Sequence, residues 1–144
     1  YRKNDTHMDL DIDLIKKENK ENPIYYIQYS YARSQSILDR KKNIIERNIE
    51  QSLELKNLYK KLYDWDQVVL NAYNKNEVHL IAHYLESLSS YFHTLWSSSK
   101  SNHKLKFLDE NENISFHNHN LLIRYQYVLS KGLGILGIKP KLKM

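Results

Sequence analysis

The spacing of hydrophobic side chains predicts helices over most of the chain. Apolar positions recur every three or four residues in four stretches, which places them on one face of an α-helix. Asn22 and Pro23 precede the first stretch and are typical of a helix start, because asparagine caps the first turn and proline lacks an N–H that would go unused there. The first stretch comprises Ile24, Ile27, Tyr31, Gln35 and Leu38, with Ile44 and Ile45 beyond.

Three further stretches complete the helical pattern. The second fades at Asn74–Asn76, and the last begins near Asn120 and ends near Leu136, before Gly137 and Pro140. Residues 97–119 predict a loop with about one turn of helix. Four amphipathic helices with short connections predict an all-α fold, an antiparallel helical bundle. The second stretch comprises Leu55, Leu58, Leu62, Trp65, Val69 and Ala72; the third comprises Val78, Ile81, Ala82, Leu85, Leu88, Ser89, Phe92 and Trp96; the last comprises Leu121, Tyr125, Val128, Leu129 and Gly132.

The beginning of the chain has a different pattern. Acidic and apolar residues alternate over residues 9–14, which predicts a short extended segment, and no partner strand is evident elsewhere. We therefore expect residues 1–21 to be the tail of a neighbouring domain or a linker, and residues 22–144 to be the helical domain. A chain that begins at Tyr1 without methionine is expected to be part of a longer polypeptide. Residues 1–22 are expected to be poorly ordered alone or to pack on the bundle.

Composition excludes several classes of protein. Hydrophobic residues make up 41% and charged residues 27%, as in globular proteins rather than disordered ones. Three glycines and two prolines are too few for a fold of many short strands and turns. The absence of cysteine excludes disulfides and thiolate metal sites and fits a cytoplasmic location. No apolar run reaches the roughly 18 residues of a membrane span, and the start has no signal-peptide core.

Charge is unevenly distributed along the chain. The formal net charge of +5 comes mostly from residues 23–63 and 97–144, whereas residues 64–96 are acidic. Such a distribution can set a positive face against RNA phosphates. From charge alone, lysine-rich helices that simply face water explain it as well.

Candidate catalytic and metal sites are weak. All glycines lie at positions 132, 134 and 137, so there is no glycine-rich phosphate loop. His79 and His83 share a helical face but lack the intervening glutamate of zinc proteases. The pair His117 and His119 falls in the predicted loop, and the aspartates of residues 9–13 are expected to be surface residues. We predict no metal ligand and no catalytic residue, and no Ser-His-Asp set follows from spacing.

Aromatic residues are the more informative feature, with twelve Tyr, three Phe and two Trp. Rings beside lysine and arginine are what single-stranded RNA recognition uses, because unstacked bases lie on rings while cations hold the backbone. Most of these rings are nevertheless expected in the core.

Four segments together resemble one family. NPIYYIQYSYARSQSI at residues 22–37 is similar to the arginyl-tRNA synthetase segment NPVYYVQYAHARxxSI, and DTHMDLDIDL at residues 5–14 is similar to the end of that family's catalytic region, DSHLDFDLDL. Residues 79–96 resemble its HYLYELAxxFHxFY helix. Residues 128–144 resemble its C-terminus, VLxNGLxLLGIxxPERM. The segments occur in the family's order over nearly the whole chain.

The chain departs from the family pattern at several positions. Tyr31 replaces the usual histidine of QYAHAR, and Gln126 stands where many relatives have a basic residue. The terminal Glu-Arg-Met is replaced by residues 142–144, which keep one cation and the methionine. The HIGH-type and KMSKS-type ATP-binding signatures are absent, so this chain is not expected to activate arginine by itself.

The resemblance implies the C-terminal anticodon-binding domain of a class I synthetase that ligates arginine to tRNA(Arg), using ATP and Mg²⁺, through an arginyl-adenylate. No cofactor is expected in this chain. Its expected partners are tRNA(Arg) and the catalytic domain of the same polypeptide, with no membrane and as a monomer. The tRNA-binding residues carried over are Tyr29, Arg33, Phe92, Trp96, Lys143 and Met144. Tyr29 lies off the apolar stripe and is the better candidate for exposure, while Arg33 fits an interdomain ion pair equally well.

Two alternatives stay open from the sequence. One is a helical protein-interaction or structural module without an RNA role, and the other is the similar domain of the cysteine or methionine enzyme. The salt dependence of tRNA binding tests the first, because binding to phosphates weakens as salt rises. Charging assays on the full-length protein test the second.

Overall fold

The computed structural model describes residues 16–19, 21–46 and 52–144. This part is mostly helical, which confirms the predicted all-α bundle apart from a parallel pair of two-residue strands. The alternating segment at residues 9–14 lies outside the described residues. The elements are α2 (Pro23–Arg40), β1 (Ile44–Ile45), α3 (Leu53–Tyr63), α4 (Trp65–Lys75), α5 (His79–Ser98), the 3₁₀ turn η1 (His103–Leu105), β2 (Ile114–Ser115) and α6 (Phe116–Ile135).

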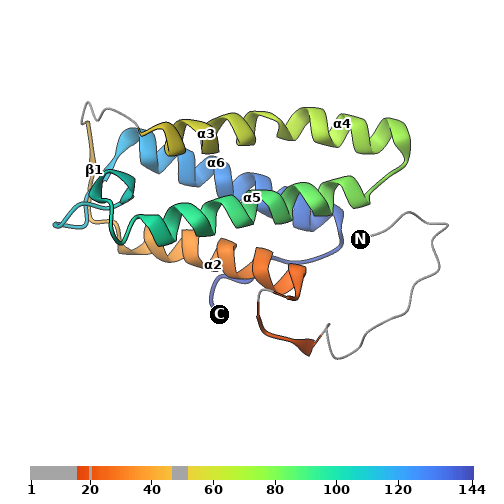
Figure 1. Cartoon of the computed structure of the whole chain (residues 1–144), viewed down its shortest axis with the longest axis horizontal. Coiled ribbons are helices and arrows are strands. Elements are labelled where there is room, and N and C mark those ends of the chain that lie inside the picture. Colours follow the sequence, from red (N-terminus) through yellow and green to blue (C-terminus); the bar gives the residue numbers. More distant parts are fainter. Residues whose placement is uncertain (1–15, 20, 47–51) are drawn as a thin grey trace.

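The helices form an elongated bundle around α5 (Figure 1). Helix α2 lies along one side of α5, α3 and α4 follow each other along the opposite side, and α6 passes behind. The chain reverses direction between α2 and α3, between α4 and α5, and between α5 and α6. Helices α2, α3, α4 and α6 all pack against α5. The C-terminal tail returns beside α2, which places the end of the chain next to the first helix of the bundle.

Tyr125 is fully buried where α2, α5 and α6 meet. Its ring stacks on Phe92 with the centroids 4.6 Å apart. Its hydroxyl donates to Ser30 Oγ at 2.9 Å, and Ser30 Oγ lies 3.0 Å from Ser89 Oγ. Burial raises the pKa of Tyr125, so its hydroxyl stays protonated and available as a donor. A satisfied polar cluster inside an apolar core fixes how the three helices approach.

The predicted helix signals operate at the start of α2 and at the end of α6. The Asn22 side chain accepts from the N–H groups of Ile24 and Tyr25 at 3.1 and 3.2 Å, and Pro23 is the first residue of α2. The last helix, α6, stops where Gly137 adopts a φ of 74°. That left-handed conformation favours glycine, which has no Cβ to clash with the backbone.

The second predicted helix is divided in two at Asp64. The predicted apolar stripe from residue 55 to 72 is real, but α3 ends at Tyr63 and α4 begins at Trp65. The carbonyl of Lys61 accepts from the Tyr84 hydroxyl at 2.7 Å and from the Asp64 N–H at 3.3 Å. This carbonyl would otherwise accept the next hydrogen bond of a continuous α-helix. The spacing of residues in the sequence does not reveal the two donors.

Two other expected boundaries were wrong. Ile44 and Ile45 do not extend the first helix; they form β1, which pairs in parallel with β2. Helix α6 begins at Phe116 rather than near Asn120, because Ser115 Oγ accepts from the Asn118 N–H at 3.2 Å and caps the helix there. Residues 117 and 119, expected in a loop, are therefore helical.

Within the described ranges, the helices are either too short or too polar to cross a bilayer.

Two glycines of α6 allow a paired test of this packing. A Cβ at Gly132 would stand 2.6 Å from Leu85 Cδ2, and Leu85 is fully buried. A Cβ at Gly134 would meet nothing within 4 Å. We expect Gly132→Ala to lower the free energy of unfolding by about 1–3 kcal/mol through overpacking, and Gly134→Ala to raise it by about 0.5–1 kcal/mol through helix propensity. Urea denaturation measures both changes, and equal stability of the two variants would contradict this account of the α5–α6 contact.

Candidate nucleic-acid interface

A hollow of about 500 Å³ lies between α2, the end of α5 and the C-terminal tail. We call it the aromatic–cation pocket. Five of the six residues predicted to bind tRNA line it: Tyr29, Arg33, Trp96, Lys143 and Met144. The tertiary structure thus brings together side chains from three segments that are far apart in the sequence.

Arg33 is the centre of the aromatic–cation pocket. Its guanidinium lies 4.6 Å from the ring centroid of Tyr29, one helical turn earlier, and 5.0 Å from that of Trp96 on α5. It also donates to the Tyr29 hydroxyl. Burial lowers the pKa of Arg33, but an arginine remains charged at neutral pH. A cation held between two rings is attracted by both and is fixed before any ligand arrives.

His93 extends the row of rings and was missed at the sequence level. Its ring stacks on Tyr29 at 5.4 Å and contacts Tyr26 at 4.3 Å, with Nε2 3.4 Å from the Tyr26 carbonyl. Burial lowers the pKa of His93, the Tyr26 carbonyl partly opposes this, and the charge of Arg33 lowers it further. His93 is therefore neutral at neutral pH and does not repel Arg33. The sequence offered one signal for His93: it follows Phe92 directly, in the helix that also contains Trp96.

The side chain of Gln28 holds the C-terminal tail in place. Gln28 is buried, its Nε2 donates to the Lys139 carbonyl at 2.9 Å, and its Oε1 accepts from the Lys141 N–H at 2.7 Å. Pro140, between the two contacts, has no N–H to satisfy. We call this pair of bonds the Gln28 clamp. It sets the last three residues beside Arg33, and sequence analysis could not find it because its partners are more than a hundred residues apart.

Phe92 is placed differently from the other predicted site residues. It is fully buried between Tyr125 and Phe107, whose ring centroid is 5.8 Å away. It has no exposed surface to offer to RNA, so the expectation of a direct contact is wrong. In a helix, the position of Phe92 falls on the core face with Leu88 and Leu95, whereas His93 and Trp96 lie toward α2.

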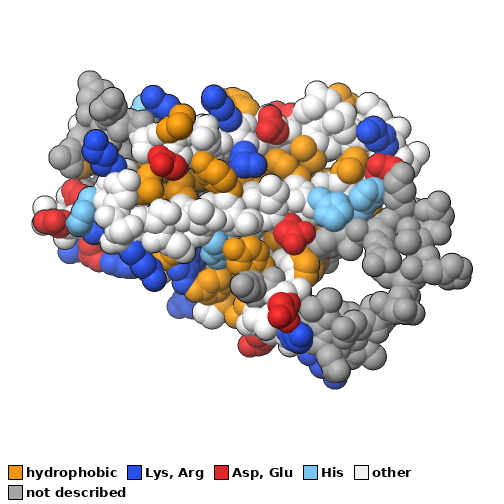
Figure 2. Space-filling model, in the orientation of Figure 1, with side chains coloured by type: hydrophobic (Ala, Val, Ile, Leu, Met, Phe, Trp, Pro, Cys, Tyr) orange, Lys and Arg blue, Asp and Glu red, His pale blue; other side chains and the backbone are white. Residues whose placement is uncertain are grey.

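Cations continue beyond the aromatic–cation pocket. A second hollow of about 280 Å³ shares Ile37, Arg40 and Trp96 with it and adds Lys100 and Lys106. Arg40 also pairs with Glu112 at 3.1 Å, so part of its charge is already balanced. Figure 2 shows Lys and Arg side chains gathered beside hydrophobic surface at this edge of the molecule. The charge excess of residues 97–144 was the sequence signal for the two lysines.

The two histidines predicted to share a helical face lie side by side on α5. His79 and His83 meet edge to face with their centroids 5.8 Å apart. Across the described part of the chain, no three His, Asp or Glu side chains converge as metal ligands would.

A helical bundle that presents a cation between rings, beside further cations, has the features of a nucleic-acid-binding domain. The family model described as the DALR anticodon binding domain matches residues 27–144. The chain belongs to this family.

Similar proteins agree with this assignment. The chain is 30% identical to an arginine–tRNA ligase of Roseobacter denitrificans, over 99% of the chain and 27% of that protein. It is 32% identical to the Pelagibacter ubique arginine–tRNA ligase, over 99% of the chain and 26% of that protein. It thus spans about a quarter of the length of these curated relatives.

Two solved structures share the fold. A Campylobacter jejuni protein provisionally assigned as an arginyl-tRNA synthetase superposes with a TM-score of 0.77 at 23% identity, over 99% of this chain and 31% of that one. The Thermus thermophilus arginyl-tRNA synthetase gives 0.64 at 24% identity, over 88% and 22%. At these identities the likeness establishes the helical architecture.

The Gln28 clamp predicts a local effect of substitution. In Gln28→Leu the Lys141 amide loses its acceptor, so we expect its hydrogen exchange to accelerate about tenfold while the helices stay protected. Gln126→Leu is the matched control, because Gln126 is a half-buried glutamine that donates to Gln35 at 2.8 Å within the bundle and does not contact the tail. Amide exchange followed by NMR measures both variants. Equal protection of Lys141 in wild type and Gln28→Leu would contradict the clamp.

His93 predicts a pH dependence of stability. In the unfolded chain a histidine titrates near about 6.5, whereas the folded state holds the pKa of His93 lower. Below about 6.5 the unfolded state therefore binds more protons, so the free energy of unfolding falls as the pH drops toward the folded pKa. Above that window both states are neutral and the effect vanishes. Melting curves between pH 7.5 and 5 should show a smaller decline for His93→Gln; an identical decline would contradict the prediction.

Proposed function

We propose that this chain is the domain of an arginine–tRNA ligase that binds the anticodon stem and loop of tRNA(Arg). The observation that carries the proposal is Arg33, held between Tyr29 and Trp96 in a hollow closed by the C-terminal tail. Membership of the DALR family and the similarity to arginine–tRNA ligases support it.

The aromatic–cation pocket offers each kind of contact that a looped-out stretch of RNA needs. Tyr29 and Trp96 are partly exposed, so a base unstacked from the anticodon loop can lie against a ring. Lys143 is exposed at the rim and offers a positive charge to a phosphate. Met144 is 46% exposed, and its flexible side chain can cover an inserted base.

The pocket is held in its binding geometry before RNA arrives. Stacking on Tyr29 fixes Arg33, and the Gln28 clamp fixes the tail. The ring of His93 stacks on Tyr29 and holds it in place. Pre-organised side chains lose little conformational entropy on binding, so more of the contact energy appears as affinity. The buried Phe92 contributes indirectly by fixing α5 against α6.

The ligation itself belongs, in this proposal, to a catalytic domain of the same polypeptide, with residues 1–21 as the connection to it. ATP and Mg²⁺ would act in that domain, where arginine is activated and joined to tRNA(Arg). The residues of this chain position the tRNA and make no bond. The proposal also takes the protein to be a monomer of the cytoplasm, consistent with its lack of cysteine.

Substitution of Arg33 tests the proposal. We expect Arg33→Met to weaken binding of tRNA(Arg) about tenfold, because it removes a cation and its stacking on two rings. If Arg33 meets a phosphate, the slope of log affinity against log salt should also decrease by about 0.7–0.9. Fluorescence anisotropy with labelled tRNA at several salt concentrations measures both quantities.

Arg124→Met is the matched control for this test. Arg124 also lies over a tyrosine, with its guanidinium 5.4 Å from the Tyr127 centroid, but it pairs with Asp66 on α4 and lies outside the hollow. It should leave tRNA affinity nearly unchanged. If the protein does not bind tRNA even at low salt, a protein-interaction role replaces the proposal. Charging of tRNA(Arg), rather than tRNA(Cys) or tRNA(Met), by the full-length protein tests the amino-acid assignment.

A further inference from the structure

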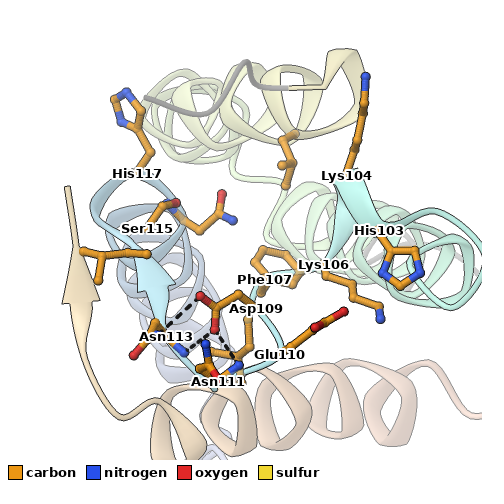
Figure 3. Close-up of a pocket in the computed structure, with 14 residues that line it drawn as sticks. His103, Lys104, Lys106, Phe107, Asp109, Glu110, Asn111, Asn113, Ser115 and His117 are labelled. Carbon is orange, nitrogen blue, oxygen red and sulfur yellow. Dashed lines mark hydrogen bonds between the residues drawn. The ribbon is translucent and has the colours of Figure 1, made fainter. Parts of the chain in front are cut away.

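A larger cavity lies at the end of the bundle where α6 begins. Its volume is about 620 Å³, within the range of about 300–1,000 Å³ typical of small-ligand pockets. Figure 3 shows Ser115 and His117 of the α6 start on one side, with His103, Lys104 and Lys106 across the cavity. We call it the α6 cavity. Nothing in the sequence analysis singled it out, because its walls come from β1, α3, η1, the following loop and α6.

Asn118 is the unusual residue of the α6 cavity. It lines the cavity, is only 5% exposed, and is the third residue of α6. Its backbone N–H is satisfied by Ser115 Oγ at 3.2 Å. Its side-chain amide, by contrast, makes no hydrogen bond to any other residue that the structure describes. A buried amide without a partner costs free energy, and such groups in folded proteins are normally satisfied.

The charges that line the α6 cavity are mixed, and the start of α6 adds a place for a phosphate. The start of a long helix carries partial positive charge and free N–H groups, and Lys104 and Lys106 add two full charges. Asp109 is already engaged, since its carboxylate accepts from the N–H groups of Asn111 and Asn113, both at 2.9 Å (Figure 3). Glu110 also lines the cavity, so two carboxylates stand against the two lysines, and the partial positive charge at the start of α6 is what remains to attract a phosphate.

The α6 cavity adjoins the hollow that contains Lys100, and that hollow adjoins the aromatic–cation pocket. It shares Lys106, Phe107 and Leu108 with the hollow that contains Lys100, and that hollow in turn shares Arg40 and Trp96 with the aromatic–cation pocket. A strand of RNA that places one base at Tyr29 can therefore pass Arg40, Lys100 and Lys106 and reach the α6 cavity. The two recognition points would then belong to a single bound strand.

We propose that the α6 cavity receives a second unstacked nucleotide of the bound tRNA. The Asn118 amide offers one donor and one acceptor to the edge of the base, the pairing that lets an amide read a base. The phosphate lies toward the start of α6. This inference rests on the proposed function, because that function supplies the RNA, and it assigns a recognition point separate from Tyr29 and Arg33.

Asn118→Leu is the direct test, because leucine has nearly the same size and cannot form hydrogen bonds. We expect tRNA(Arg) to bind about tenfold more weakly, as the loss of the base contact implies. The melting temperature should stay level or rise, because an unpaired buried amide is removed. Chemical probing of the bound tRNA should show one additional reactive loop nucleotide, with protection at the aromatic–cation pocket retained. Asn120→Leu, exposed on the same helix, is the matched control.

The outcomes separate this inference from the proposed function. Unchanged affinity and footprint in Asn118→Leu would overturn the inference and leave the proposed function standing. Absence of tRNA binding by the wild-type protein would remove both. If Asn118→Leu does not fold, ¹⁵N spectra of the wild type decide instead: the Asn118 side-chain signals must shift with tRNA(Arg). A shift with the four nucleoside monophosphates alone, and none with tRNA, would assign the cavity to free nucleotides and overturn the proposal.

Discussion

Tyr125 joins three helices through one fully buried side chain. Its ring packs on Phe92 of α5 and its hydroxyl bonds Ser30 of α2, so neither helix can slide past α6 without breaking a packed or polar contact. Because interiors are close-packed, such a contact fixes positions along the whole helix. The aromatic–cation pocket depends on this constraint, since Arg33 and Trp96 come from the two helices that Tyr125 holds together.

The binding surface is made of residues that adjoin the core rather than belong to it. On α5 the core face carries Phe92, and the next position, His93, stacks beside Tyr29. The rings of the pocket therefore pack against the interior of the bundle, which holds them in place. This arrangement lets one set of apolar contacts stabilise the fold and orient the residues proposed to meet RNA. The Gln28 clamp likewise fixes the position of the tail, which does not pack into the core as deeply as the helices do.

Family membership and geometry support each other at different levels. The DALR match gives the family, and the similarity to arginine–tRNA ligases supports the proposed RNA partner. The structure adds which surface is available: three adjoining hollows with cations among their lining residues, from the tail past Trp96 to the start of α6. Acidic residues also line these hollows, namely Asp39, Asp109 and Glu110, and Asp109 accepts hydrogen bonds from nearby N–H groups.

The sequence by itself determined most of the helices, their order and five of the residues that line the aromatic–cation pocket. Helical periodicity and caps are local, so Asn22, Pro23 and Gly137 were readable directly, and the family motifs pointed to Tyr29, Arg33, Trp96, Lys143 and Met144. Only the tertiary structure decided which rings are exposed and what holds the tail. Burial of Phe92, the break at Asp64, the clamp at Gln28 and the cavity at Asn118 all depend on contacts between distant segments. No spacing along one chain segment encodes such contacts, because they arise only once the helices have packed.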